Sequence, residues 1–381
     1  MLMHPKPQSL LIAPDKFKGS LRASEVARAI GEGILSAQPN MRICYQPMAD
    51  GGDGSIELLH ECWGLEEYQL EVSDPLFRPI TASYYGSGEA AFIEMARASG
   101  LALLAPHERN CLKTTSLGTG QLMLHAFRQG FRQLNLFIGG SATNDAGMGI
   151  ASALGYTFLD ARGQPLPPTG EQLGRVHHIQ ASELARSLQQ CKIQVVCDVN
   201  NPFYGPQGAA YVYAPQKGAD QAAVALLDAG LRHLDAIFWQ QGYGRVQALP
   251  GAGAAGGVGG GMAALFGATL KPGIDLFIEL FELEEKVQQA DAVITGEGRL
   301  DEQSFQGKVA GGILRLCQQH QKPLYLICGQ QQLGPRPGAP PLPFRLSTLL
   351  DFAPSAEAAM TDAARYLRQA GAALARSWEE G

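Results

Sequence analysis

The sequence predicts an α/β protein of two domains, one of which is inserted into the other. A chain of 381 residues with 45% hydrophobic content can bury a core large enough for two domains. Short apolar runs repeatedly end in polar, glycine-rich loops, and amphipathic helical patterns lie between them. Continuous apolar runs are typical of strands buried on both faces, so this alternation favours mostly parallel sheets covered by helices.

Six apolar runs are the predicted strands, and each is followed by a polar loop. In chain order they are LLIA before PDKFKGS, ICYQPMA before DGGDGS, LNLFI before GGSATNDAGMG, IQVVC before DVNNPFYGPQG, DAVI before TGEGRLDEQS and LYLIC before GQQQ. Ligands bind outside the carboxyl ends of the strands in parallel sheets. We therefore expect the binding site among these loops.

Helical patterns lie between the predicted strands. Ser20 precedes LRASEVARAIGEGIL, whose apolar residues recur at roughly helical spacing, so a helix is expected to begin there. QLMLHAFRQ, just before Gly130, is a second predicted helix. The C-terminal segment PSAEAAMTDAARYLRQAGAALARSWEE favours one long helix that begins near Ser355.

The inserted domain is expected to begin where short β-like runs alternate with turn signals, from about Tyr68 to Tyr85. Residues 1–75 and 286–381 would form one discontinuous α/β domain, and residues 76–285 the inserted mixed α/β domain. The active site would lie in the cleft between the two domains. The strands expected in the sheet of the first domain are residues 10–13, 43–49, 292–295, 324–328 and 346–350.

Composition excludes several classes of protein. A net charge of −6 and a pI near 5.8 argue against nucleic acid as a partner, because phosphate-backbone binding needs a concentrated basic surface. The seven cysteines are scattered and form no Cys-x-x-Cys, which favours a reducing cytoplasm over a disulfide or zinc framework. The apolar run before Asp15 is too short for a secretory signal. Eight glycines dilute the uncharged segment 248–270, so no membrane span is expected there.

Charged residues gather in the first two loops. Lys16 and Lys18 flank Phe17, so in an extended segment the two ammonium groups point the same way and can clamp a phosphate or a carboxylate. Asp50 and Asp53 surround two glycines, a pattern that fits Mg²⁺, which prefers a few carboxylates plus phosphate oxygens. A plain Asx-turn would require an aspartate there as well.

Two further loops carry candidate groups. GGSATNDAGMG, residues 139–149, offers backbone N–H groups and the side chains of Ser141, Thr143 and Asn144, which suits a phosphate or a carboxylate. It is not a Walker A loop, and a tight glycine turn would look similar. Asp198 directly follows a predicted buried strand, where a general base, a metal ligand or a helix cap is often held.

The loop TGEGRLDEQSFQGK is denser in polar groups than folding alone requires. Its candidates are Glu297, Arg299, Asp301, Gln303, Ser304 and Lys308. Cations, a phosphate-binding loop, carboxylates for Mg²⁺ and a carboxylate near a nucleophilic hydroxyl are the parts that phosphoryl transfer needs. The residues therefore indicate an α/β enzyme that handles phosphate.

Two other classes stay open on the residues alone. Gly251, Gly253 and Gly256 match G-x-G-x-x-G, the pyrophosphate turn of an NAD-dependent hydroxy-acid dehydrogenase, although Pro250 stands where a buried strand should feed the turn. Close backbone packing or a mobile glycine-rich loop would also explain these glycines. A sugar-acid- or phosphate-responsive binding protein without catalysis is the second alternative.

Taken together, these strings resemble the type-1 glycerate kinase family. The matching stretches are IAPDKFKGSL, MADGGDGS, IEMARASGLALL, TTSLGTGQLM, GGSATNDAGMG, CDVNNPFYGPQGAAYVYAPQKGA, PGAGAAGGVGGG and TGEGRLDEQSFQGK. They occur in the family's order over nearly the whole chain. The resemblance implies a flavodoxin-like domain beside an unusual mixed α/β domain. It also implies ATP-dependent phosphorylation of D-glycerate at the 2-hydroxyl to give 2-phosphoglycerate, with 3-phosphoglycerate or another hydroxy acid as alternatives.

A few positions depart from the family's pattern. Asn200 stands where aspartate is commoner, Cys111 replaces a proline, and GKVAGGI lacks a proline after Lys308. Asn200 weakens any two-carboxylate metal site in its loop. No candidate catalytic group is lost.

We expect the following roles for an in-line transfer. The catalytic candidates are Asp198 as the acceptor of the glycerate proton, Lys16 at the moving phosphoryl group, and Asp15. Glycerate would be held by Lys18, Arg299 and Ser20. Mg²⁺ would be carried by Asp53 with Asp50 or Glu297. The nucleotide phosphates would lie on Gly139, Gly140, Ser141, Thr143 and Asn144. The expected partners are ATP and D-glycerate, with no nucleic acid or membrane, and the chain would be a monomer or a homodimer.

Overall fold

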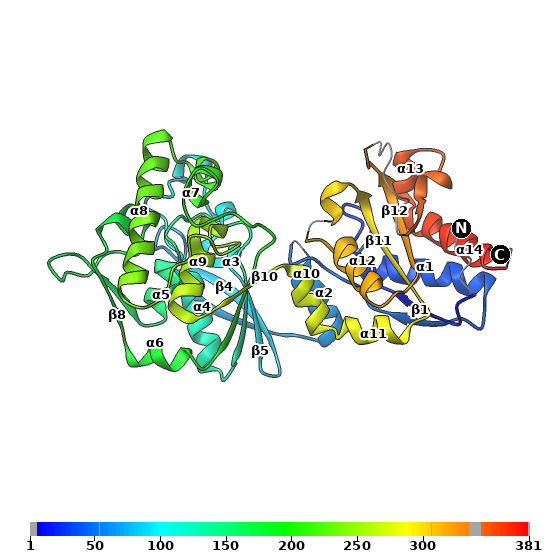
Figure 1. The fold of residues 1–381 in the computed structure, drawn as a ribbon, viewed down its shortest axis with the longest axis horizontal. Helices are drawn as coiled ribbons and strands as arrows, with labels where there is room; N and C mark the ends of the chain where they lie inside the picture. The colour runs from blue at the N-terminus through cyan, green and yellow to red at the C-terminus, as the bar shows by residue number, and fades with distance from the viewer. Residues whose placement is uncertain (1–5, 53, 306, 335–343, 380–381) are drawn as a thin grey trace. The chain divides into compact units, whose positions relative to one another are not determined.

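The computed structural model describes residues 6–52, 54–305, 307–334 and 344–379 and divides into two compact units (Figure 1). Unit 1 comprises residues 1–58 and 272–381, and unit 2 comprises residues 59–271. Each unit has its own sheet and its own hydrophobic core. The prediction of a mixed α/β architecture is confirmed.

Unit 1 is built on a five-stranded parallel sheet in the order β13-β12-β11-β1-β2. In Figure 1 the N-terminal strand β1 is blue and the late strands β11 and β12 are yellow to orange, so segments far apart in the chain share this sheet. All five strands that we expected in the sheet are present. Their bounds are β1 (Ser9–Ile12), β2 (Arg42–Tyr45), β11 (Ala292–Leu300), β12 (Leu324–Gln331) and β13 (Arg345–Thr348).

The strand order changes direction between β1 and β11. The chain passes from β1 to its neighbour β2 on one side, and later adds β11, β12 and β13 in turn on the other side. Counted within this sheet, the order is 2-1-3-4-5, which is the flavodoxin-like order that the resemblance implies. Loops that leave neighbouring parallel strands in opposite directions open a crevice at the carboxyl ends.

The helices of unit 1 complete its core. Helix α1 packs against α14 so closely that a Cβ atom on Gly33 would lie 2.1 Å from the carbonyl oxygen of Arg368. The bounds are α1 (Ala23–Ala37), α10 (Gly273–Leu280), α11 (Leu283–Gln289), α12 (Val309–Gln319), α13 (Ala356–Thr361) and α14 (Ala363–Ser377), with 3₁₀ helices η5 (Glu302–Phe305) and η6 (Leu349–Asp351). Helix α2 (Ser55–Trp63) carries the chain from unit 1 into unit 2.

Two helix boundaries differ from prediction. The first helix is capped by Arg22, whose backbone N–H donates to Glu25 Oε2 at 2.9 Å, and not by Ser20. The C-terminal segment was expected to be one long helix. It forms two helices, α13 and α14, which are separated at Asp362. Its predicted start is confirmed, because Ser355 Oγ accepts the backbone N–H of Ala358.

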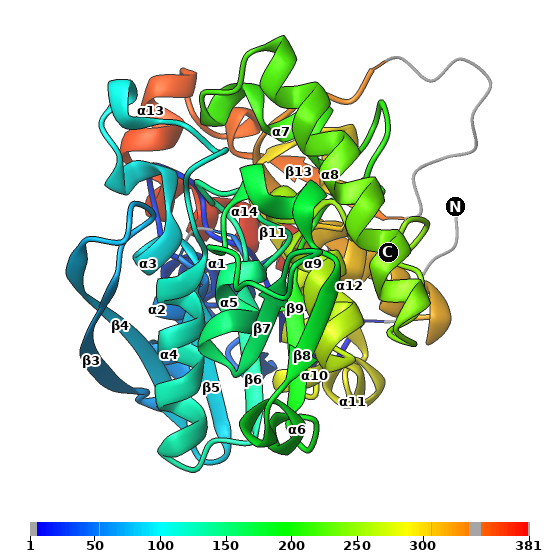
Figure 2. The same cartoon turned by 90° about the vertical axis from the view of Figure 1, so that its left-hand side faces the viewer.

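Unit 2 contains a six-stranded mixed sheet in the order β10-β9-β6-β5-β4-β3 and a separate hairpin of β7 and β8. Helix α4 packs beside α5 and lies along β4 and β5 (Figure 2). The strands are β3 (Glu66–Ser73), β4 (Pro79–Ser87), β5 (Ala90–Glu94), β6 (Gln133–Phe137), β7 (Tyr156–Leu159), β8 (His178–Ala181), β9 (Lys192–Val196) and β10 (Thr269–Lys271). The helices are α3 (Ala96–Ser99), α4 (Leu117–Arg128), α5 (Met148–Ala153), α6 (Glu183–Leu188), α7 (Ala209–Tyr213), α8 (Gln221–Gln240) and α9 (Ala254–Phe266), with η1 (Leu101–Leu103), η2 (Pro106–Glu108), η3 (Gly170–Arg175) and η4 (Pro215–Lys217).

The compact units divide at residues 58/59 and 271/272, whereas the sequence placed the domain boundaries at 75/76 and 285/286. The turn signals at residues 73–75 belong to the hairpin that joins β3 to β4, and this hairpin lies wholly within unit 2. Helix α10 packs on α12 and belongs to unit 1. The sequence signals marked a turn inside the inserted unit rather than its edge.

The glycine-rich segment around α9 is a packing element. The preceding residues 241–250 are all described, and they form turns and loop rather than a strand. A dinucleotide-binding turn directly follows a strand, so this segment does not have that architecture. A Cβ atom on Gly253 would lie 2.2 Å from Pro202 O, and one on Gly256 would lie 2.2 Å from Thr143 O. Close backbone packing therefore accounts for these glycines. Among the described helices, none has the length and apolar character needed to cross a bilayer.

Candidate functional site

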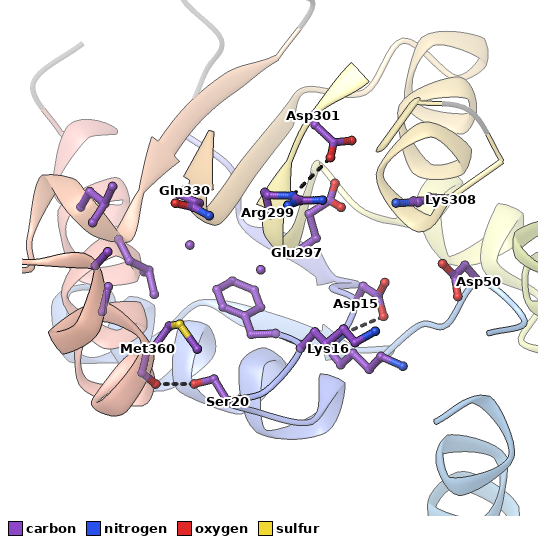
Figure 3. Close-up of a pocket in the computed structure, with 18 of the residues that line it drawn as sticks. Asp15, Lys16, Ser20, Asp50, Glu297, Arg299, Asp301, Lys308, Gln330 and Met360 are labelled. Atoms are coloured by element: carbon purple, nitrogen blue, oxygen red, sulfur yellow. Dashed lines mark hydrogen bonds and ion pairs between the residues drawn. The ribbon is translucent and has the colours of Figure 1, made fainter. Parts of the chain in front are cut away.

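A cavity of about 590 Å³ lies in unit 1 at the carboxyl ends of β1 and β11 (Figure 3). The loop after β1 lines it with Asp15, Lys16, Lys18 and Ser20. The loop after β2 contributes Asp50, the end of β11 and the segment beyond it contribute Glu297, Arg299, Asp301 and Lys308, and β12 contributes Gln330. The cavity thus lies at the switch point of the sheet, at the carboxyl ends of the strands, where the sequence predicted a binding site. The expected position of the active site between the two domains stays a prediction.

The loop after β1 is held by bonds that continue the sheet. The N–H of Asp15 donates to Gly296 O at 2.8 Å, and Pro14 O accepts the N–H of Met48 at 2.9 Å. Phe17 is buried, and its N–H donates to Leu21 O at 2.8 Å to close the turn. Because Phe17 is anchored in the core, Lys16 and Lys18 on either side of it both line the cavity.

Two carboxyl groups of the cavity hold protons unusually well. Burial and the nearby charge of Asp50 raise the pKa of Asp15 to about 7, although its Oδ1 accepts the N–H of Lys16 at 2.7 Å. Burial, together with the charge of Asp15, raises the pKa of Glu297 to about 7. Among the described residues, Glu297 Oε1 has no hydrogen-bond partner even though it is fully buried. Such an orphaned oxygen is costly unless a proton, a cation or a ligand donor satisfies it.

Two further cationic groups line the cavity, Arg299 on β11 and Lys308 at the start of α12. Arg299 Nε forms an ion pair with Asp301 Oδ2 at 3.3 Å, and Asp301 Oδ1 also accepts the N–H of Gln303 at 3.0 Å. Lys308 stands at the N-cap of α12, and its charge opposes the rise in pKa of Asp15 and Glu297. Lys308 was noted in the sequence as part of a crowded loop, and the structure places it in the cavity.

The predicted magnesium ligands are partly brought together. Asp50 and Glu297 line the same cavity, and Asp53 lies outside the described residues. Within the described part of the chain, no three Asp, Glu, His or Cys side chains form a ready-made metal cage. Mg²⁺ is commonly bound by one or two carboxylates plus substrate phosphates, so the pair and the orphaned Glu297 oxygen fit an ion that arrives with a phosphate ligand.

The opposite wall of the cavity is apolar, and sequence reasoning missed it. Its residues are Phe17, Leu349, Leu350, Ala356, Ala359 and Met360. Two of these side chains are exposed despite their apolar character, Met360 by 57% and Leu350 by 42%. The wall is tied to the loop after β1, because Ser20 Oγ donates to Met360 O at 2.6 Å.

The predicted phosphate-binding loop lies in unit 2, between β6 and α5. Gly139 and Gly140 are exposed, whereas Ser141, Thr143 and Asn144 are buried. Within the described residues, Thr143 Oγ1 and both amide atoms of Asn144 have no hydrogen-bond partner. The carboxylate of Asp145 anchors the loop through four hydrogen bonds. It accepts them from Ser116 N at 2.8 Å, Ser116 Oγ at 2.7 Å, Gly147 N at 3.1 Å and Gly149 N at 3.2 Å.

Lys217 is a functional candidate that the sequence analysis did not single out. Its Nζ donates to Ser141 Oγ at 2.8 Å and to Thr143 O at 2.7 Å. Burial lowers the pKa of Lys217 to about 8. The residue stands within the family-like string APQKGA, which was its only sequence signal.

Asp198 follows β9 in unit 2 and is exposed. The unit 1 cavity therefore brings together Asp15, Lys16, Lys18, Ser20, Asp50, Glu297 and Arg299 from the predicted set. Asp198 and the loop of residues 139–144 belong to the other unit, and their predicted roles stay predictions.

Comparison with known proteins agrees with the motifs. The family model described as "Glycerate kinase family" matches residues 10–379. A glycerate kinase of Halalkalibacterium halodurans is 42% identical over 86% of each chain, and a glycerate 2-kinase of Escherichia coli is 42% identical over 84% of each chain. A crystal structure from Salmonella typhimurium LT2, named as a candidate glycerate kinase 2, superimposes with a TM-score of 0.84 and 37% identity, covering 98% of this chain and 99% of that one. The chain therefore belongs to the glycerate kinase family.

Proposed function

We propose that this protein transfers the γ-phosphoryl group of ATP to the 2-hydroxyl of D-glycerate, giving 2-phosphoglycerate and ADP. Family membership and the 42% identity to a relative named glycerate 2-kinase support the reaction. The structural observation that carries the proposal is the unit 1 cavity, where lysines and an arginine face partly buried carboxyl groups at the switch point of a parallel sheet.

The cations of the cavity have distinct proposed tasks. Lys16 and Lys308 neutralise the phosphoryl group as it moves, which is the main requirement of phosphoryl transfer. Lys18 and Arg299 bind the carboxylate of glycerate; the guanidinium of Arg299 can present two parallel donors to it. The hydroxyl of Ser20 is committed as a donor to Met360 O, so its oxygen is left to accept a hydrogen bond from the substrate.

Asp15 is the proposed base in the cavity. A general base works best when its pKa lies near the working pH, and the pKa of Asp15 is raised to about 7. Its Oδ1 accepts the N–H of Lys16, so Oδ2 is the atom proposed to take the proton of the 2-hydroxyl. Asp198 is the alternative base that the sequence suggested.

Asp50 and Glu297 are the residues proposed to hold magnesium, which would screen the negative charge of the nucleotide phosphates. The loop of residues 139–144 keeps its proposed role as a binding site for a phosphate or a carboxylate. The unpartnered groups of Thr143 and Asn144 and the ammonium of Lys217 support that role.

A coupled assay tests the reaction. Purified protein with Mg-ATP and D-glycerate is incubated with enolase alone and then with enolase plus phosphoglycerate mutase. We expect phosphoenolpyruvate in both cases, because enolase accepts 2-phosphoglycerate directly. Phosphoenolpyruvate that forms only with the mutase would mean that the product is 3-phosphoglycerate, and no ATP-dependent product would contradict the proposal.

A further inference from the structure

We propose that the apolar wall of the unit 1 cavity binds the purine ring of the nucleotide, and that the Gln330 carboxamide hydrogen-bonds to the edge of the base. The inference rests on ATP being the phosphoryl donor, as proposed above. It assigns a base-binding site to unit 1, whereas the sequence suggested only a phosphate-binding loop in unit 2.

Polar and apolar groups are segregated within the cavity. In Figure 3, Met360 and Gln330 lie on one side of the view, and Asp50, Lys16 and Lys308 lie on the other. A nucleotide has the same division, because a flat and weakly polar ring stands at one end and a charged phosphate chain at the other. Base and phosphates can therefore each meet a matching surface in a single orientation.

The apolar wall has no task in binding glycerate. Glycerate carries a hydroxyl or carboxylate oxygen on every carbon and offers no apolar face to Leu350 or Met360. These side chains are 42% and 57% exposed, and covering them with a ring would be favourable because it removes their apolar surface from water. The wall therefore fits the other substrate of the reaction.

The volume of the cavity supports the same occupant. At about 590 Å³ it lies within the range of roughly 300–1,000 Å³ that is usual for sites of drug-sized ligands. Glycerate alone would fill only a small part of it. A nucleoside with its phosphates is of the size that such a cavity accommodates.

Gln330 is placed to read the base. It is half-buried on β12, where it is paired in register with Arg299 of β11, and it lines the cavity beside the apolar wall. Its carboxamide provides both donors and an acceptor, the combination that matches an adenine edge. Because Ser20 ties the wall to the loop that carries Lys16 and Lys18, base and phosphate contacts belong to one connected structure.

Two charge insertions test the wall. Leu350→Glu and Met360→Glu each replace an exposed apolar side chain with a carboxylate, which removes ring contact and repels phosphates. We expect KM for ATP to rise by about tenfold or more, equivalent to about 1.4 kcal/mol, with KM for glycerate and kcat at saturating ATP within about twofold of wild type. Leu226→Glu is the matched control, since Leu226 is 52% exposed on α8 of unit 2.

The comparison with the control decides the result. Circular dichroism and thermal melting of the three variants check that each is folded. An unchanged KM for ATP in both wall variants, or the same increase in the Leu226→Glu control, would overturn the proposal.

Gln330→Leu tests recognition of the base. The substitution keeps a similar size and removes the hydrogen-bonding groups. We expect the ratio of kcat/KM for ATP to that for GTP to move toward one, and an unchanged ratio would remove Gln330 from base recognition.

A binding measurement separates this inference from the proposed reaction. Titration calorimetry with Mg-ADP, without glycerate, should show about tenfold weaker binding to Leu350→Glu than to wild type. If wild type made no 2-phosphoglycerate but this loss of binding were seen, the base site would stand and the proposed reaction would fail. If wild type made 2-phosphoglycerate and the two proteins bound Mg-ADP equally, the base site would be wrong and the reaction would stand.

Discussion

Lys217 Nζ lies 2.8 Å from Ser141 Oγ in the buried interior of unit 2, and both residues are nearly inaccessible to solvent. A second bond of 2.7 Å joins the same ammonium group to Thr143 O. Lys217 thus anchors the loop of residues 139–144 through these two hydrogen bonds. A buried charge is costly to desolvate, so its retention here is consistent with a role in holding this loop for an anion.

Lys217→Met is predicted to weaken binding of the anion that this loop holds. The change keeps the length of the side chain and removes donors of charge-assisted hydrogen bonds, each worth about 1.5–3 kcal/mol. We expect KM for ATP or for glycerate, but not both, to rise about tenfold or more, which identifies the ligand as a phosphate or a carboxylate. The matched control is Lys113→Met at an exposed lysine of the same unit. Equal steady-state constants in the variant and in wild type would contradict this role.

Lys16 and Lys18 form a pair with separable roles. Lys16→Ala should lower kcat by about two to three orders of magnitude, because it removes a cation that acts on the transferring group. Lys18→Ala should instead raise KM for glycerate with a smaller effect on kcat. Steady-state kinetics with each substrate varied in turn measures both. An increase in KM with unchanged kcat for Lys16→Ala would make Lys16 a binding residue only.

Asp15→Asn and Asp198→Asn distinguish the two proposed bases. Loss of the true base should reduce kcat by about two to four orders of magnitude. We expect that loss for Asp15→Asn, whose carboxyl group lines the cavity with a pKa raised to about 7. A folded Asp15→Asn enzyme with kcat within about tenfold of wild type would exclude Asp15, and a large loss in Asp198→Asn alone would restore the sequence-based assignment.

The substitution Asp15→Asn should also change how the free energy of unfolding depends on pH. The pKa of Asp15 rises from 3.8 to about 7 on folding, so the folded protein binds more protons between these values. Its contribution to stability is therefore complete below about pH 4 and is lost as the pH rises through 7. Asparagine cannot ionise, so Asp15→Asn should be more stable than wild type at pH 8, by roughly 1–4 kcal/mol, and should show little gain at pH 4. Urea unfolding at both pH values measures this, and an equal difference at the two would contradict it.

The polar half of the cavity was predictable because its signals are local. Five of the six apolar runs form strands that are mostly buried, and β2 is the exception because it is largely exposed. Parallel strands bring their carboxyl ends to one edge, so Asp15 and Glu297 were expected together. The position of the crevice follows from the strand order in the structure, which changes direction between β1 and β11.

The apolar wall and Lys217 depend on contacts that sequence periodicity does not show. The run that includes Leu349 and Leu350 continues the pattern of β13, but the N–H of Thr348 donates to Asp351 Oδ2 at 2.7 Å and turns the chain into η6. Leu349 is then buried and Leu350 is exposed to the cavity. Lys217 donates a hydrogen bond to Ser141, which is 76 residues away in the sequence, so no local sequence pattern predicts this contact.

Transfer of the γ-phosphoryl group of ATP to the 2-hydroxyl of D-glycerate, as proposed above, places the phosphate of the product on C2. Proton-coupled ³¹P nuclear magnetic resonance of the purified product formed from Mg-ATP and D-glycerate shows which carbon carries the phosphate. We expect a phosphate resonance that is split by the single proton on C2. A resonance split by the two protons on C3, or no glycerate phosphate at all, would contradict it.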